Sequence, residues 1–106
     1  MRAFLEWIKK EPDCYGFKVH GNEFTRDQPD VVGVYRGRAF CMEFKKAGAV
    51  PRPSQASVLR MWERAGAIVG APTSRDEAVA LLRAASAVQL PQGACHERRK
   101  LRLPSL

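Results

Sequence analysis

The stretch Pro29–Lys45, PDVVGVYRGRAFCMEFK, decides the fold because two runs with strong β-propensity flank a short turn. Val31–Tyr35 is β-branched and apolar, and Arg38–Lys45 resumes an alternating pattern after Arg36-Gly37. These signals predict a β-hairpin. Its turn fixes the register of the side chains that follow it.

The second strand of this hairpin carries different chemistry on its two faces. Because side chains two residues apart share a face of a strand, we expect Phe40, Met42 and Phe44 to point into the core. Glu43 and Lys45 then point together to the opposite face. Taken alone, a carboxylate and an ammonium group on one face of a strand are typical of a structural ion pair.

The first strand of the hairpin begins with a second carboxylate, Asp30, which the turn brings near Glu43. Two adjacent carboxylates need a proton or a divalent cation to relieve their repulsion. Oxygen-only ligation favours Mg2+ or Mn2+, and the backbone carbonyl of Phe44 offers another oxygen. Such a metal polarises a phosphate oxygen, while Lys45 orients water or neutralises charge on the phosphoryl group. The combination predicts phosphodiester hydrolysis; the alternatives are an ion pair and a turn aspartate.

Helices and short strands are expected on both sides of the hairpin. The spacing of apolar residues, with Pro and Gly as breaks, gives the order α-β-β-β-α-β-α. Outside the hairpin, helices are expected over residues 2–10, 54–65 and 74–88, and strands over residues 15–20 and 67–71.

The two later helices have recognisable starts. Ser54 and Ser74 are expected to be N-caps, and Glu77 occupies the capping-box position of the last helix. The buried stripe of the middle helix is expected to consist of Val58, Leu59, Met61 and Trp62.

The length of 106 residues allows one domain with a single core. We expect this domain over residues 1–88, followed by a basic tail over residues 89–106 that is disordered or packed on a partner subunit. With 18 Lys and Arg against 11 Asp and Glu, the formal charge of +7 favours a polyanionic partner, and nucleic acid is the first candidate.

Membrane, secretory and zinc-binding classes are not supported by the sequence. No apolar run approaches the roughly 20 residues of a membrane-spanning helix. The N-terminus lacks the apolar region of a signal peptide, so we expect a cytoplasmic location. Cys14, Cys41 and Cys95 are odd in number and widely spaced, which favours reduced thiols, and neither His20 nor His96 completes a zinc-like pair with them.

Several motifs occur together in an order typical of one family. They are Pro29-Asp30, then twelve residues, then Glu43-Phe44-Lys45, a loop rich in Pro and Gly, and Ser54-Gln55 at a helix start. This pattern resembles the PD-(D/E)XK nuclease superfamily and, more closely, the small stand-alone VRR-NUC proteins of phages and bacteria. Residues 63–82, ERAGAIVGAPTSRDEAVALL, add the family's order of helix, glycine, short strand and capped helix. The resemblance covers about residues 1–83.

The resemblance implies a restriction-endonuclease-like α/β core, with a central mixed sheet flanked by helices. It implies that Asp30 and Glu43 bind Mg2+ or Mn2+. Lys45 is then the catalytic lysine, and Gln55 is the glutamine near the active site. The family also places a glutamate in its first helix, for which Glu6 is the nearest candidate; the alternative is an ordinary solvated carboxylate.

The activity implied by the resemblance is that of a metal-dependent DNA endonuclease selective for branched DNA such as four-way junctions. A homodimer without a small-molecule cofactor, in a bacterial or phage-infected cell, is the implied form. The alternatives are a catalytically weak or inactive nucleic-acid-binding protein with the same fold, and an interaction module. Candidate DNA contacts, for each of which solvated surface charge is the alternative, are Arg26, Arg36, Arg38, Lys46, Arg52, Arg98, Arg99 and Lys100.

Overall fold

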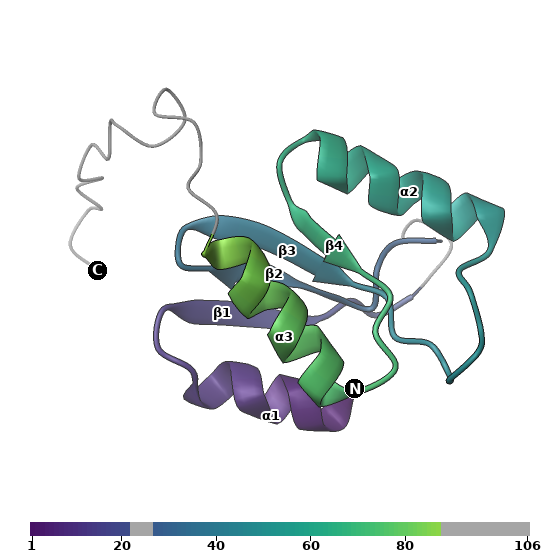
Figure 1. Cartoon of the computed structure of the whole chain (residues 1–106). Helices are drawn as coiled ribbons and strands as arrows, with labels where there is room; N and C mark the ends of the chain where they lie inside the picture. Colours follow the sequence, from purple (N-terminus) through teal and green to yellow (C-terminus); the bar gives the residue numbers. More distant parts are fainter. Residues whose placement is uncertain (22–26, 88–106) are drawn as a thin grey trace.

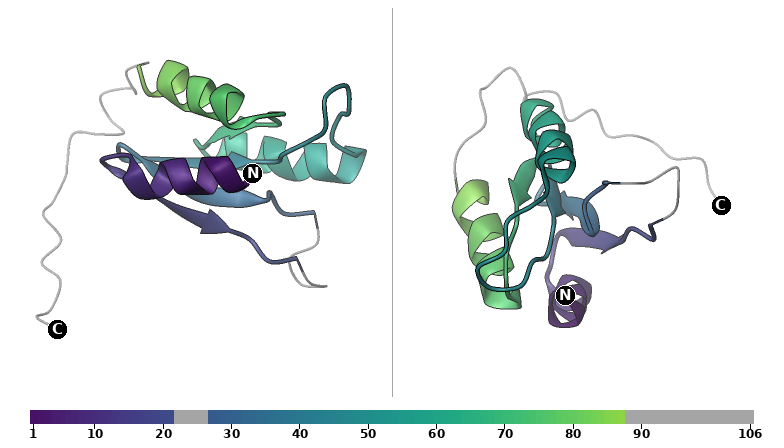
Figure 2. Two further views of the ribbon diagram at one scale, coloured as in Figure 1. Left: turned by 90° about the horizontal axis from the view of Figure 1, so that it is seen from below. Right: turned by 90° about the vertical axis from the view of Figure 1, so that its right-hand side faces the viewer.

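The computed structural model describes residues 1–21 and 27–87, and its elements follow the order expected from the sequence (Figure 1, Figure 2). Several elements begin or end a few residues from the expected positions. The helices are α1 (Arg2–Lys10), α2 (Pro53–Arg64) and α3 (Arg75–Ser86), and the strands are β1 (Cys14–Lys18), β2 (Val31–Tyr35), β3 (Arg38–Met42) and β4 (Ile68–Gly70).

The strands form one mixed sheet in the order β1-β2-β3-β4, which confirms the expected α/β class. The pairs β1–β2 and β2–β3 are antiparallel, whereas β3–β4 is parallel. A parallel pair needs a long crossover, and α2 supplies it. Helices α1 and α3 lie on one face of the sheet and α2 lies on the other (Figure 2).

The predicted hairpin is present, and its turn has the expected tight geometry. Arg36 and Gly37 both have positive φ, 50° and 84°, as a two-residue type I′ turn requires. The resulting register pairs Val31 with Met42 and Tyr35 with Arg38. This register brings the start of β2 to the end of β3.

The core lies between the sheet and the two helices α1 and α3. Phe4, Phe40, Met42 and Leu82 are fully buried there. The ring of Phe4 meets that of Phe40 edge to face, with centroids 6.1 Å apart. It also packs against Phe44, at 5.5 Å. The inward orientation predicted for Phe40, Met42 and Phe44 is therefore confirmed.

The start of α2 differs from the prediction. Pro53 is its first residue and Arg52 its N-cap, so the expected N-cap role of Ser54 is wrong. Proline favours the first helical position because its φ is already helical and no N–H is lost. The side-chain oxygen of Gln55 accepts the Arg52 N–H at 3.0 Å, which is the N3 half of a capping box.

The buried stripe of α2 also differs in one position. Leu59 is buried and Trp62 is partly buried, as expected, but the side chain of Met61 is 60% exposed. Two helical steps rotate a side chain by about 200°, so a residue two positions after Leu59 points away from the sheet.

The last helix begins as predicted. Ser74 is its N-cap and accepts the Glu77 N–H at 3.2 Å. The Glu77 carboxylate in turn accepts both the N–H and the hydroxyl of Thr73, at 3.1 and 2.8 Å. These bonds, the backbone one first, lower the pKa of Glu77.

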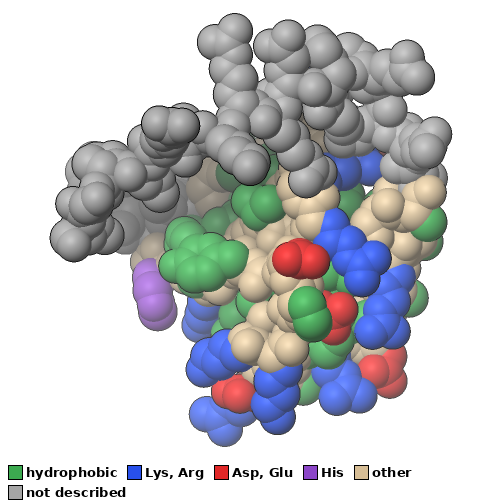
Figure 3. Space-filling model, turned by 90° about the vertical axis from the view of Figure 1, so that its left-hand side faces the viewer, with side chains coloured by type: hydrophobic (Ala, Val, Ile, Leu, Met, Phe, Trp, Pro, Cys, Tyr) green, Lys and Arg blue, Asp and Glu red, His purple; other side chains and the backbone are tan. Residues whose placement is uncertain are grey.

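Part of the surface is apolar. Figure 3 shows hydrophobic side chains uncovered on one side of the molecule. Large hydrophobic residues with exposed side chains are Met1, Tyr15, Phe17, Val34, Val50 and Met61.

Two expectations concern regions other than the core. Among the described residues, no helix has the length and the apolar character that crossing a membrane requires. The expected tail over residues 89–106 lies outside the part of the chain that the structure describes.

Candidate active site

Two carboxylates meet where β2 begins and β3 ends. Asp30 immediately precedes β2, and Glu43 immediately follows β3. Because Val31 pairs with Met42 across the antiparallel ladder, Asp30 stands opposite Glu43. The structure therefore brings together the two acids that the sequence predicts to be neighbours.

Asp30 is held by its backbone and its side chain. Its carbonyl accepts the Val19 N–H at 2.7 Å, which extends the β1–β2 ladder by one step. Its Oδ2 accepts the Phe44 N–H at 2.8 Å, so the carboxylate takes the place of a backbone partner for the chain beyond β3. The preceding residue, Pro29, is fully buried. These contacts fix the carboxylate at the end of the sheet.

The chain beyond β3 stays extended alongside the residues after β4. Glu43 N–H donates to the Gly70 carbonyl at 2.9 Å, and Lys45 N–H donates to the Pro72 carbonyl at 3.0 Å. Alternate residues of an extended chain direct their N–H and C=O groups to opposite edges. The backbone groups of Phe44 consequently face β2 and Asp30.

Glu43 is a buried carboxylate among charged and polar side chains. The residue is 5% exposed, and its Oε1 accepts a hydrogen bond from Gln55 Nε2 at 3.2 Å. Burial, and after it the negative charge of Asp30, raise the pKa of Glu43 above its ordinary value. The positive charges of Lys45 and Arg52 oppose this shift without cancelling it.

Gln55 joins the lysine to the glutamate. Lys45 Nζ donates to Gln55 Oε1 at 2.8 Å and lies 3.7 Å from Glu43 Oε1. The Arg52 N–H donates to the same Gln55 oxygen. The first turn of α2 thereby orients the amide, and the amide orients the ammonium group. Gln55 is 9% exposed, so this network is largely shielded from solvent.

The donor set fits a hard divalent cation. Among residues 1–21 and 27–87, no group of three or more His, Cys, Asp or Glu side chains is placed to hold a metal ion. Mg2+ commonly takes one or two carboxylates and keeps several waters, so Asp30 and Glu43 satisfy its usual needs. A zinc site built of thiols and imidazoles does not match these residues.

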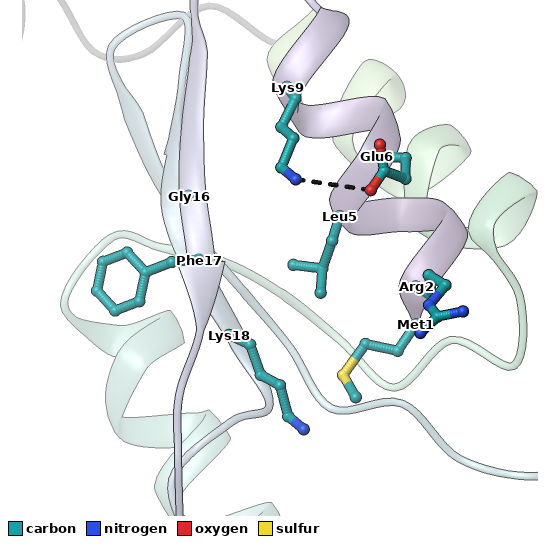
Figure 4. Close-up of a pocket in the computed structure, with 8 residues that line it drawn as sticks. All are labelled: Met1, Arg2, Leu5, Glu6, Lys9, Gly16, Phe17 and Lys18. Carbon is teal, nitrogen blue, oxygen red and sulfur yellow. Dashed lines mark ion pairs between the residues drawn. The ribbon is translucent and has the colours of Figure 1, made fainter.

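The candidate acid Glu6 lies elsewhere. It sits on α1, its side chain is 57% exposed, and it pairs with Lys9 at 3.6 Å. Figure 4 shows both beside a cavity of about 480 Å3 between α1 and β1. The structure thus places Glu6 on the α1 face of the sheet, whereas Glu43 contacts α2 through Gln55.

The basic candidates divide between the two ends of the hairpin. Arg52 and the exposed Lys46 flank the site in the chain, and Arg52 pairs with Asp27 at 3.2 Å. Arg36 and Arg38 lie at the far end, next to the turn. Arg38 donates there to the carbonyls of residues 66 and 85, a structural role. Arg26, Arg98, Arg99 and Lys100 lie outside the described residues.

Two contacts near the site were not predicted from the sequence. Asp27 has a positive φ of 67° and forms the ion pair with Arg52. The next residue, Gln28, accepts a hydrogen bond from the Trp62 indole at 3.3 Å. Both contacts tie the segment before Asp30 to α2. The local signal in the sequence is Asp27, two residues before Pro29, because Asp and Pro are typical of turns.

The described thiols do not supply a nucleophile. Burial raises the pKa of Cys41 to about 12. Burial and the nearby charge of Glu11 raise that of Cys14 to about 11. Since the thiolate is the reactive form, both groups are inert at neutral pH.

One of three comparisons with known proteins finds a protein of similar fold. No family model matches the sequence, and no curated protein matches it. Among solved structures, a VRR_NUC domain protein superimposes with a TM-score of 0.58 at 20% sequence identity, over 77% of this chain and 80% of that one. The chain therefore has the fold of a VRR_NUC domain protein, as the sequence resemblance predicts.

Proposed function

We propose that this protein is a metal-dependent DNA endonuclease that hydrolyses phosphodiester bonds. One observation carries the proposal. A buried glutamate with a raised pKa faces an aspartate, and a lysine is hydrogen-bonded to a glutamine beside it. The fold shared with a VRR_NUC domain protein supports the same conclusion.

Asp30, Glu43 and the Phe44 carbonyl are the groups that would hold Mg2+ or Mn2+. The Phe44 N–H donates to Oδ2 of Asp30 at 2.8 Å and so orients the carboxylate that would bind the ion. When bound, the ion supplies Lewis acidity toward a phosphate oxygen and lowers the pKa of a coordinated water. Burial, and after it the negative charge of Asp30, raise the pKa of Glu43, and a bound cation would relieve the repulsion between the two acids.

Lys45 has a different task in this proposal. Its ammonium group lies 3.7 Å from Glu43 Oε1 and donates to Gln55 at 2.8 Å, so its position does not depend on the carboxylate alone. A fixed positive charge next to the metal-binding acids stabilises the charge that develops on the phosphoryl oxygens or orients the attacking water. Gln55 is a positioning residue that acts through Lys45.

The substrate is DNA in this proposal, and branched DNA such as a four-way junction is the preferred form. The charge of +7 supports a polyanionic substrate, because phosphate contacts dominate nucleic-acid affinity. A homodimer would place two such sites about a twofold axis, which suits a symmetric junction.

The test is cleavage of labelled four-way junction, flap, single-stranded and linear duplex DNA with Mg2+ or Mn2+. Asp30→Asn removes one charge and keeps an acceptor for the Phe44 N–H, and we expect it to abolish cleavage. Asp13→Asn is the matched control, since Asp13 lies in the turn after α1 with a positive φ of 59° that asparagine tolerates. Equal cleavage by wild type and Asp30→Asn would refute the proposal.

A nucleic-acid-binding protein without turnover is the second candidate. The observation that favours it is the position of Glu6, which pairs with Lys9 away from the two site carboxylates. Tight, salt-sensitive binding of DNA with no metal-dependent cleavage of any of the four substrates would establish this alternative.

A further inference from the structure

The described part of the chain covers only half of the sheet face that carries Glu43. Helix α2 packs along β4, and Cys41 of β3 is buried on this face. Over β1 and β2 the same face is exposed: Tyr15 is 74% exposed, Phe17 55% and Val34 47%. Figure 4 shows the Phe17 ring pointing away from α1, toward the open side.

The strand register connects this open face to the site. Phe17 pairs with Val32, which pairs with Cys41, and Tyr15 pairs with Val34 in the next row. Cys41 precedes Glu43 by two residues, so both share this face. The Phe17 row therefore lies one step of about 7 Å from the row of Asp30 and Glu43, and the Tyr15 row lies two steps away.

The chemistry of the open face favours bases over other occupants. Two aromatic rings at alternate positions of one strand are the arrangement with which sheet surfaces stack unpaired nucleobases. The charge of +7 attracts a polyanion such as a nucleic-acid strand. The open face is also continuous with the candidate metal site, because the row of Phe17 is next to the row of Asp30 and Glu43.

We propose that Tyr15 and Phe17 stack unpaired bases of the nucleic-acid strand whose phosphate lies at Asp30 and Glu43. This inference rests on the proposed function for the placement of the phosphate. It narrows the substrate to DNA in which bases next to the cut are unpaired, such as a flap, a single strand or a junction whose bases at the branch point are unstacked. Bases inside an intact duplex are not available to the rings without unstacking.

The test measures binding without cleavage, in the Asp30→Asn background with EDTA, by fluorescence anisotropy. The probes are a labelled oligothymidylate and a linear duplex. Tyr15→Leu with Phe17→Leu keeps apolar area and removes both rings, and affinity for the oligothymidylate should fall at least about tenfold. Affinity for the duplex, which rests on phosphate contacts, should change less than about twofold.

The matched control exchanges the rings, as Tyr15→Phe with Phe17→Tyr, and should retain wild-type affinity for the oligothymidylate. Photocrosslinking of an oligothymidylate containing 5-iododeoxyuridine should label Tyr15 or Phe17 in the parent and neither position in the leucine variant. Thermal unfolding checks that the leucine variant is folded, as expected for side chains this exposed.

Unchanged affinity of the folded leucine variant for the oligothymidylate would overturn the inference. A second result would also overturn it. Sedimentation velocity could show that the double variant Tyr15→Glu with Phe17→Glu dissociates a dimer, while its affinity for the oligothymidylate stays at the wild-type value. A second copy of the chain, and not nucleic acid, would then cover the face. Failure of the proposed function would give a different result, namely no DNA cleavage by the wild-type protein. The comparison of binding affinities would still decide whether Tyr15 and Phe17 stack on bases.

Discussion

The two faces of the sheet differ in what they bury. Toward α1 and α3, the side chains of Phe4, Phe40 and Leu82 are fully buried in a continuous apolar cluster. Toward α2, the buried groups include Glu43 and Gln55, and part of the sheet is uncovered. Apolar burial stabilises the fold, whereas a buried carboxylate costs free energy unless it is paired. The apolar burial that stabilises the fold is therefore concentrated on one face, and the candidate active site lies on the other.

The largest expected effect is on catalysis at the α2 face. Lys45→Ala removes the ammonium group that Gln55 orients, and we expect the cleavage rate to fall by about 10²- to 10⁴-fold. Lys46→Ala is the control, because Lys46 is exposed and its loss should weaken DNA affinity only slightly. Cleavage within about threefold of wild type in single-turnover assays of Lys45→Ala would exclude Lys45 from the chemistry.

The next effect is on stability at the core face. Phe40→Ala should lower the free energy of unfolding by about 3–5 kcal/mol, because the ring is fully buried against Phe4. Val34→Ala, on the open face, should change it by less than about 0.5 kcal/mol. Urea denaturation measures both. Similar losses in the two variants would show that the open face is covered in solution.

A smaller effect concerns the charge of Glu43. Its pKa is raised by burial and by Asp30, so the folded protein holds this proton more tightly than the unfolded chain. The stabilisation is complete below the unfolded-chain pKa and is lost as pH rises through the folded-state pKa. Without divalent ions, Glu43→Gln should therefore raise the free energy of unfolding at neutral pH by on the order of 1 kcal/mol relative to wild type.

The same variant should lose this advantage in acid, where the wild-type carboxyl is protonated. Urea titrations at about pH 4 and about pH 8 give the comparison. A Glu43→Gln variant less stable than wild type at the higher pH would mean that Lys45 and Gln55 compensate the buried charge fully.

The smallest effect is expected at the ion pair between Asp27 and Arg52. The Arg52 side chain is 66% exposed, and such pairs contribute about 0.2–1 kcal/mol. Asp27→Asn should lower the free energy of unfolding by that amount at low salt, and added salt should remove the difference. A larger loss of unfolding free energy that salt does not remove, measured by urea denaturation, would mean that the carboxylate also stabilises the positive-φ backbone conformation of Asp27.

Local patterns in the sequence were sufficient for the hairpin and for the meeting of the two acids. The alternation around Glu43 predicts its face, and the turn at Arg36-Gly37 fixes which residue stands opposite it. Only the family resemblance predicts that Gln55 belongs to the site. Its contacts with Lys45 and Glu43 depend on how α2 packs against the sheet, which no local sequence pattern determines.

The predictions that failed concern positions set by tertiary packing or by competition at a helix end. Ser54 is a good N-cap in general, but Pro53 takes the first helical position and displaces the cap by two residues. Met61 fits an apolar pattern, yet only the stripe through Leu59 faces the sheet. The candidate role of Arg38 as a DNA contact is not one of these failures and stays a prediction, but the sequence around Arg38 gives no local sign of its hydrogen bonds to two carbonyls far along the chain.

Anomalous diffraction from crystals of the wild-type protein grown with Mn2+ would locate a metal ion at the candidate site. We expect a manganese peak bonded to the carboxylates of Asp30 and Glu43, with Lys45 still held by Gln55, and no such peak in crystals of Asp30→Asn. Crystals with no manganese between these two carboxylates, and with the contacts of Glu43 to Lys45 and Gln55 intact, would contradict it.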